Sequence, residues 1–269
     1  MSETNHVIVI GAGAAGMLAA IAAAREGAAV ELWEQNEKPG KKLFITGKGR
    51  CNVTNACDME ELLGSVVSNS KFLYSSFYGF TNQDMMDLLE QAGLRLKVER
   101  GNRVFPQSDK SSDVISALSA LLRQAGVRVC LNQKAEGLAV EEGVCKGVRC
   151  GGRIQTADRV IVATGGLSYP ATGSTGDGLK WAADSGHRLT ELSPALVPFE
   201  VKETETVKEL QGLSLKNIEA AVYDGKKELY REFGEMLFTH FGVSGPVLLS
   251  ASSFCAKAIR KRPLRLVID

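Results

Sequence analysis

Three glycines near the N-terminus are spaced as in a turn that binds phosphate. Gly11, Gly13 and Gly16 occupy the three glycine positions of a GxGxxG pattern. The first glycine permits a tight turn, the second lets a pyrophosphate approach the backbone, and the third lets a helix pack closely on a strand. The helix predicted after the turn presents free N–H groups at its N-terminus, where negative charge is favoured. The pattern predicts a dinucleotide phosphate site.

An acidic residue stands where a ribose would need a hydrogen-bond acceptor. Glu34 lies 18 residues beyond Gly16, close to the spacing at which a carboxylate binds a ribose diol. A carboxylate at this position argues against a ribose that carries a 2′-phosphate. FAD and NAD both remain open, because the glycine pattern alone does not separate them.

The segments that flank the three glycines and Glu34 must hold these residues in place. The β-branched run at residues 7–10 predicts a buried strand, and the alanine-rich run at residues 17–26 predicts a helix that ends at Gly27. A second apolar run, at residues 29–33, leads directly into Glu34. Strand, glycine turn, helix, strand and acid together predict a βαβ unit of Rossmann type.

Two further segments are candidates for ligand contact. Residues 41–55 contain four Lys or Arg residues among glycines and small polar residues, which predicts backbone and cations around an anion. A solvated basic loop is the alternative. The apolar strand predicted at residues 159–163 runs into Thr164 and Gly165, at the edge where ligands lie in a doubly wound sheet. A plain turn is the alternative there.

The rest of the chain predicts an α/β fold with added β structure. Asp58 and Thr81 are candidate N-caps of packing helices near residues 58–67 and 83–91, and apolar residues at helical spacing predict a third near residues 112–126. Short alternating strands at residues 127–131, 135–140, 144–149 and 152–156 predict an antiparallel meander. Residues 179–184 predict one more helix, and most of the remaining segments, at residues 213–222, 228–232 and 264–268, are of β type.

The composition argues against several classes of function. The 269 residues carry a net charge of +1, which gives no electrostatic case for a nucleic acid or an anionic membrane. No apolar run is long enough for a membrane span, and the first strand begins too early for a signal peptide. The six cysteines form no CxxC pair and no Cys/His cluster. We therefore expect no metal site, and reduced thiols in a cytoplasmic protein.

Five motifs occur in an order that resembles a known family. They are GAGAAG at residues 11–16, KKLFITGKGRCN at 41–52, RVFP at 103–106, ATGG at 163–166 and FTHFGVSGP at 238–246. Together they resemble the YhiN/BaiN-like FAD-dependent oxidoreductases, also labelled aminoacetone oxidase family flavoproteins. The resemblance covers essentially the whole chain.

The resemblance implies a flavoprotein with two dinucleotide-binding domains. A Rossmann-type FAD-binding domain with an antiparallel β meander is expected at residues 1–190. The start of an inserted, mostly β substrate or cap domain is expected at residues 191–269. Family members continue past this point and return to the FAD domain with a glycine-rich segment that closes over the flavin. The chain is therefore expected to be either a fragment or an atypical short member, with an incomplete inserted domain.

The same resemblance implies FAD as the cofactor and assigns residues to it. The pyrophosphate would lie on the glycine turn, the adenosine ribose on Glu34 and Gln35, and the adenine near the backbone of Ala135. The segment after the second strand would extend toward the flavin, and the end of the 159–163 strand would pass along the cofactor. In full, the predicted contacts are Gly11, Gly13, Ala14, Ala15, Gly16, Glu34, Gln35, Lys42, Gly47, Arg50, Cys51, Asn52, Ala135, Thr164 and Gly165.

The expected activity is hydride transfer between a small organic substrate and flavin. NAD(P)H or dioxygen would be the other redox partner. A bound flavin does the redox chemistry itself, so no catalytic side chain is assigned; for Cys51, His240 and Tyr169 structural roles are favoured. The alternatives are an NAD-dependent dehydrogenase and a nucleotide-binding module without turnover. The oligomeric state is not predicted.

Overall fold

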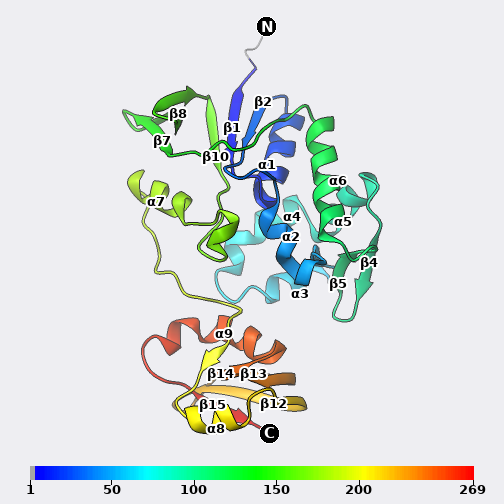
Figure 1. The fold of residues 1–269 in the computed structure, drawn as a ribbon, viewed down its shortest axis with the longest axis vertical. Coiled ribbons are helices and arrows are strands. Elements are labelled where there is room, and N and C mark those ends of the chain that lie inside the picture. The colour runs from blue at the N-terminus through cyan, green and yellow to red at the C-terminus, as the bar shows by residue number, and fades with distance from the viewer. Residues whose placement is uncertain (1–3) are drawn as a thin grey trace. The chain divides into compact units, whose positions relative to one another are not determined.

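A computed structural model describes residues 4–269. The chain divides into two compact units, of which the first ends at Leu189 and the second begins at Thr190. Figure 1 shows the elements of each unit. Among the described residues, no helix combines the length and apolar composition needed to cross a bilayer.

A parallel sheet organises the first unit. Its order is β10-β1-β2-β6, and every neighbouring pair is parallel. The order and direction confirm the predicted Rossmann-type fold, in which the strands before and after the first helix are neighbours. The strands are β1 (His6–Ile10), β2 (Ala29–Trp33), β6 (Arg128–Cys130) and β10 (Arg159–Val162).

Helices cover one face of this sheet. Val7 and Val9 of β1 pack with Met17 of α1 (Ala14–Arg25) and Leu118 of α6 (Ser111–Gln124). Side chains of a strand alternate between its two faces, which is why alternate residues of β1 enter this core. The helix α1 ends at Arg25, and Gly27 follows it in the predicted left-handed conformation, with a φ of +87°.

The other face carries a small antiparallel sheet. Ile8 and Ile10 of β1 pack there with Val148 and Trp181. The sheet has the order β7-β8-β9, and Trp181 belongs to α7, which packs into the same core. Its elements are β7 (Gly137–Glu141), β8 (Val144–Cys150), β9 (Arg153–Thr156) and α7 (Asp177–Asp184).

One strand of the predicted meander belongs elsewhere. Residues 127–131 were expected in the antiparallel meander, but β6 pairs in parallel with β2. The reason is its position after α6, because a strand that follows a crossover helix returns parallel to the sheet. The meander therefore has three strands, and the parallel sheet gains one.

The connection from β2 to α6 is more structured than expected. Residues 41–55 were predicted as a loop but form a short helix, a 3₁₀ turn and a strand. The helix predicted at residues 58–67 stops at Gly64. A second antiparallel sheet has the order β3-β5-β4. The elements are α2 (Lys41–Ile45), η1 (Thr46–Gly49), β3 (Thr54–Asn55), α3 (Met59–Gly64), η2 (Ser70–Leu73), α4 (Tyr74–Gly79), α5 (Asn82–Gln91), β4 (Leu96–Glu99) and β5 (Arg103–Pro106).

The second unit is a separate antiparallel sheet, as the predicted mostly β character requires. Its order is β11-β14-β13-β12-β15. Helix α9 packs on it, and Ala220, Met236, Val243 and Leu248 share one core. The elements are β11 (Phe199–Glu200), α8 (Thr204–Glu209), β12 (Ser214–Asp224), β13 (Lys227–Phe238), β14 (Gly242–Ser244), α9 (Pro246–Ile259) and β15 (Arg265–Ile268). A last short turn, η3 (Pro170–Thr172), lies in the first unit.

Candidate functional site

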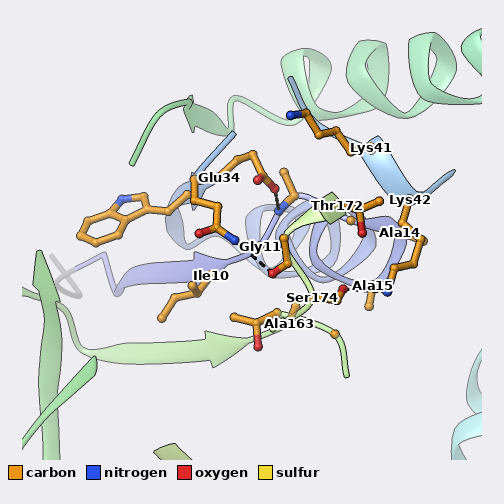
Figure 2. Close-up of a pocket in the computed structure, with 18 of the residues that line it drawn as sticks. Ile10, Gly11, Ala14, Ala15, Glu34, Lys41, Lys42, Ala163, Thr172 and Ser174 are labelled. Carbon is orange, nitrogen blue, oxygen red and sulfur yellow. Dashed lines mark hydrogen bonds between the residues drawn. The ribbon is translucent and has the colours of Figure 1, made fainter. Parts of the chain in front are cut away.

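A cavity of about 340 Å³ lies in the first unit where β1, β2 and β10 end. Figure 2 shows its walls, with the glycine turn on one side and the segment that contains Thr172 and Ser174 beside it. This is the edge at which open α/β sheets bind ligands. The residues that line it are Ile10, Gly11, Ala12, Gly13, Ala14, Ala15, Trp33, Glu34, Gln35, Gly40, Lys41, Lys42, Leu43, Thr46, Gln133, Ala135, Ala163, Thr164, Gly165, Thr172, Gly173, Ser174, Asp177 and Trp181.

The three glycines of the turn meet three different surroundings. A Cβ on Gly11 would lie 2.6 Å from the carbonyl oxygen of Ala163, and one on Gly16 would lie 1.8 Å from the carbonyl oxygen of Gly11. Both positions therefore exclude any larger residue. A Cβ on Gly13 would meet nothing within 4 Å, although Gly13 lines the cavity. Glycine at position 13 thus keeps backbone accessible from the cavity.

The N-terminus of α1 opens into this cavity. Ala14 and Ala15 begin the helix and line the cavity wall. Within the described residues, no side chain caps this end of the helix, and its first turn has no acidic residue. Unpaired N–H groups and the helix dipole make such an end favourable for an anion.

The carboxylate of Glu34 is buried and already serves two partners. Its Oε2 accepts the backbone N–H of Ala12 at 2.9 Å, the contact drawn as a dashed line in Figure 2. Its Oε1 accepts the backbone N–H of Asn36 at 2.9 Å and the Asn36 side-chain amide at 2.7 Å. A carboxylate has about four acceptor positions, so one remains open on Oε2. That position is available to a ribose hydroxyl.

A glycine-rich segment at residues 165–176, here called the strap, is hydrogen-bonded to the β2–α2 connection and to the first turn of α2. Lys42 Nζ donates to the carbonyl oxygen of Ser168 and to the hydroxyl of Ser174, both at 2.7 Å. Gln35 Nε2 donates to the carbonyl of Gly173 at 3.0 Å. Asn36 Nδ2 donates to the carbonyl of Thr172 at 3.2 Å. The strap therefore forms a fixed wall of the cavity.

Ten of the predicted cofactor residues line the cavity. They are Gly11, Gly13, Ala14, Ala15, Glu34, Gln35, Lys42, Ala135, Thr164 and Gly165. Asn36, Thr172 and Ser174 were not predicted. The polarity of the strap was a signal for Thr172 and Ser174. Its contact with residues 35–42 was not visible, because residues 138 positions apart meet there.

Five predicted residues lie outside the cavity wall: Gly16, Gly47, Arg50, Cys51 and Asn52. The guanidinium of Arg50 pairs with Glu99 and Asp109 and lies 4.2 Å above the centre of the Phe105 ring. Cys51 is buried, and burial raises the pKa of its thiol. Their part in holding a cofactor stays a prediction.

The cavity has the chemistry that the adenosine half of FAD requires. A helix N-terminus suits the pyrophosphate, the open acceptor of Glu34 suits the ribose, and Trp33, Trp181 and Ala135 supply apolar wall. Lys42 adds a positive charge to the wall. Among the described residues its ammonium group donates to neutral oxygens and pairs with no carboxylate. A volume of about 340 Å³ is at the low end of the ~300–1,000 Å³ typical of ligand sites.

Comparison with protein families and curated proteins gives consistent matches. The model of the HI0933-like protein Rossmann domain matches residues 5–254. A 3-dehydro-bile acid delta(4,6)-reductase of Clostridium scindens is 36% identical over 261 residues, which cover 95% of this chain and 61% of that protein. A ribosomal RNA dihydrouridine synthase of Escherichia coli is 30% identical over 252 residues, with 94% and 61% covered. The chain thus spans about 61% of the length of these relatives.

Solved structures share the fold. An open-conformation flavocytochrome c3 fumarate reductase matches with a TM-score of 0.57 and 23% identity, over 80% of this chain and 47% of that one. A 3-ketosteroid-delta4-(5alpha)-dehydrogenase from Rhodococcus jostii RHA1 matches with a TM-score of 0.50 and 15% identity, over 80% and 61%. At these identities the likeness concerns the fold alone.

Proposed function

The chain belongs to the HI0933-like Rossmann-domain family, and from this membership we propose that it is an FAD-dependent oxidoreductase. The observation that carries the proposal is the uncapped N-terminus of α1, which faces the same cavity as the buried carboxylate of Glu34. This pairing of an anion site with a ribose acceptor suits a dinucleotide whose ribose has a free diol. FAD meets that description.

The residues of the cavity would hold the adenosine half of the cofactor. The N–H groups of Ala14 and Ala15 would donate to the pyrophosphate, with Gly13 leaving room for its approach. Glu34 would accept a ribose hydroxyl on Oε2 while it keeps Ala12 and Asn36. The bound flavin would supply the redox chemistry, as the acceptor and donor of hydride.

The reaction we propose is reduction of a carbon–carbon double bond conjugated to a carbonyl. The two curated relatives carry names with different substrates, a bile acid and ribosomal RNA. Both names describe the same change, because dihydrouridine is uridine in which the ring C5–C6 double bond has gained two hydrogens. A hydride from NAD(P)H would reach the β-carbon of the double bond by way of the flavin, and a proton would add to the α-carbon. Dioxygen is the alternative partner for the flavin.

A small organic molecule is the first candidate substrate, and RNA is the second. The RNA candidate comes from the name of the Escherichia coli relative, a ribosomal RNA dihydrouridine synthase. An NAD-dependent dehydrogenase and a binding module without turnover are the competing functions. The dehydrogenase predicts that the chain binds NAD rather than FAD. The binding module predicts that a bound ligand undergoes no turnover.

The test is a comparison of FAD and NAD as ligands. We expect the purified protein to bind FAD in an isothermal titration and to give the two-banded absorption spectrum of oxidised flavin. With FAD bound, NAD(P)H added without oxygen should bleach that spectrum, and a conjugated enone or an RNA should restore it. Binding of NAD with no binding of FAD would overturn the proposal. FAD binding with no bleaching by NAD(P)H and none by an organic substrate would leave a binding module.

A further inference from the structure

The charges of the second unit are unevenly distributed. Residues 190–269 contain 11 basic and 11 acidic residues, so the unit is neutral as a whole. Residues 257–265 nevertheless carry five basic residues and no acidic one, and Lys226 and Lys227 form a second basic pair. Clusters of this kind bind polyanions even where the net charge is small, because the local field attracts the ligand.

The fold brings these two basic segments together. Strands β12 and β15 are antiparallel, with Tyr223 opposite Arg265 and Val222 opposite Leu266. The turn that follows β12 therefore lies beside the segment that precedes β15. An open cavity of about 680 Å³ lies between them. Its lining consists of Tyr223, Gly225, Lys226, Arg262, Pro263, Leu264 and Arg265.

Most of the cations around this cavity have no acidic partner. Asp224 pairs with Arg262, and this pairing, together with the nearby Lys227 and Lys261, lowers the pKa of the Asp224 carboxyl. Across residues 4–269, the ion pairs of the second unit do not include Lys226, Lys227, Lys261 or Arg265. Four positive charges are thus left for a ligand.

The aromatic residue of the cavity is paired with a cation. The guanidinium carbon of Arg265 lies 5.1 Å from the centre of the Tyr223 ring. The Tyr223 hydroxyl donates to Glu228 at 2.9 Å, and Glu228 is also neutralised by Arg231. Arginine planes and aromatic rings both stack on unpaired bases. Phosphate-binding cations therefore surround a surface that also suits a base.

We propose that this basic cavity in the second unit, formed by residues 223–227 and 261–265, binds the phosphate backbone of single-stranded RNA. The identity of the polyanion rests on the RNA candidate of the proposed function, whereas the site itself does not depend on FAD. A concave lining with one lysine, two arginines and one tyrosine, and with Lys227 and Lys261 next to lining residues in the sequence, suits a strand that enters it. A membrane surface is flat and is bound by an amphipathic helix with an apolar face, which this lining lacks.

The experiment measures binding of a short fluorescein-labelled single-stranded RNA by fluorescence anisotropy, with the full chain and without added FAD. Four phosphate contacts on a single strand predict a slope of about −2.8 for log K against log salt. Affinity should therefore fall about 50-fold between roughly 50 and 200 mM salt. Absence of binding at low salt, or binding that salt does not weaken, would overturn the proposal.

A matched pair of double variants locates the site. Lys226→Glu with Lys261→Glu removes two of the four unpaired cations, and should weaken RNA binding at least roughly tenfold and make the salt slope less steep by about 1.4. Lys202→Glu with Lys216→Glu changes the net charge equally at exposed positions of the same unit outside the cavity, and should change affinity less than about twofold. Equal losses in both variants would mean attraction by net charge alone and would refute the site.

Two further arms separate the alternatives. Sedimentation with phosphatidylserine vesicles should leave the protein in the supernatant, and binding to vesicles with none to RNA would replace the proposal with a membrane contact. If the unaltered chain binds RNA and does not bind FAD, the proposed flavoenzyme fails while the RNA site stands. If it binds FAD and does not bind RNA, the RNA site fails while the proposed flavoenzyme stands.

Discussion

At the scale of single residues, the carboxylate of Glu34 connects three parts of the cavity wall. It accepts from Ala12 in the glycine turn and from Asn36, and the Asn36 amide continues to Thr172 in the strap. The sequence predicted Glu34 from its position after the second strand. The part played by Asn36 depends on a side-chain rotamer and on a distant carbonyl, which no local pattern encodes.

Replacing Glu34 by Gln should weaken FAD binding about 10- to 100-fold, because a hydrogen bond to a charged group contributes about 1.5–3 kcal/mol. The amide nitrogen of Gln would also face the donors of Ala12 or Asn36, so we expect a lower thermal midpoint. Titration calorimetry and thermal unfolding measure the two effects. The control is Glu37→Gln, at an exposed carboxylate that pairs with Lys41. Unchanged FAD affinity in Glu34→Gln would remove Glu34 from the site.

Cys255 makes the stability of the second unit depend on pH. It belongs to α9 and is fully buried in a core that this helix shares with Val222, and burial raises the pKa of its thiol from 9.0 to about 11. The unfolded chain loses this proton near pH 9, whereas the folded chain keeps it, so the thiol destabilises the fold as pH rises from about 9 to 11. The stability contributed by the neutral thiol is complete below pH 9.

Unfolding in urea, repeated between pH 8 and 11, tests this dependence. The unaltered chain should lose about 2–3 kcal/mol more than Cys255→Ala across that range, the value of a two-unit pKa difference. Cys145→Ala, at a half-buried thiol of the first unit, is the control. Parallel curves for the unaltered chain and Cys255→Ala would contradict the expectation.

At the scale of elements, the first βαβ unit was predictable because its signals are local. A β-branched run, a glycine turn and an alanine-rich helix lie within residues 6–34, and each is dictated by its neighbours in the chain. Strand β6 was misassigned because its three residues carry too little pattern to show their partner. Its pairing with β2 follows from the crossover helix before it. The strap is recognisable as a polar loop, but the partners that hold it are distant in sequence.

The N-terminus of α1 offers a test in which stability and function change in opposite directions. Ala15 is exposed in the first turn. Ala15→Glu should stabilise the fold by about 0.3–1 kcal/mol, because a negative charge at a helix N-terminus interacts favourably with the helix dipole. The same charge should weaken FAD binding at least about 100-fold by repelling the pyrophosphate.

Ala22→Glu is the matched control, since Ala22 is exposed on the same helix two turns later. It should leave FAD affinity unchanged. Calorimetric titration and denaturant unfolding give both quantities for each variant. If the two substitutions weaken FAD binding equally, the helix terminus is not where the anion binds.

The strap can be loosened at one glycine. Gly173 has a φ of +104°, and a Cβ there would lie 2.7 Å from Gln35 Nε2. Gly173→Ala should therefore break the contacts with Gln35 and Asn36, raise the rate of proteolysis within residues 165–176 and speed the release of FAD. Gly166→Ala is the control, because a Cβ at Gly166 meets nothing within 4 Å. Identical cleavage of both variants would show that these contacts do not hold the strap.

At the scale of the whole molecule, each unit has its own hydrophobic core. FAD should therefore raise the unfolding temperature of the first unit alone. At a concentration 100 times the dissociation constant the stabilisation is about 2.7 kcal/mol, or roughly 5–10 °C for a unit of this size. Scanning calorimetry should resolve a transition that moves with FAD and one that stays. A single transition that moves as a whole would refute this expectation.

Net charge illustrates what composition hides at this scale. A value of +1 gave no reason to consider a nucleic acid, since opposite charges cancel in the sum. The position of the cations depends on the pairing of β12 with β15, a contact between segments about 40 residues apart. Only the folded chain reveals which charges are neighbours.

The strap leads to a prediction about the kinetics of ligand entry. We expect its ties to Gln35, Asn36 and Lys42 to open before a ligand as large as a dinucleotide passes, so that opening precedes binding. In stopped-flow mixing, the observed association rate should rise with FAD concentration only until it reaches the opening rate, and then level off. The strap would thereby act as a rate-limiting gate, and the plateau would measure how often it opens.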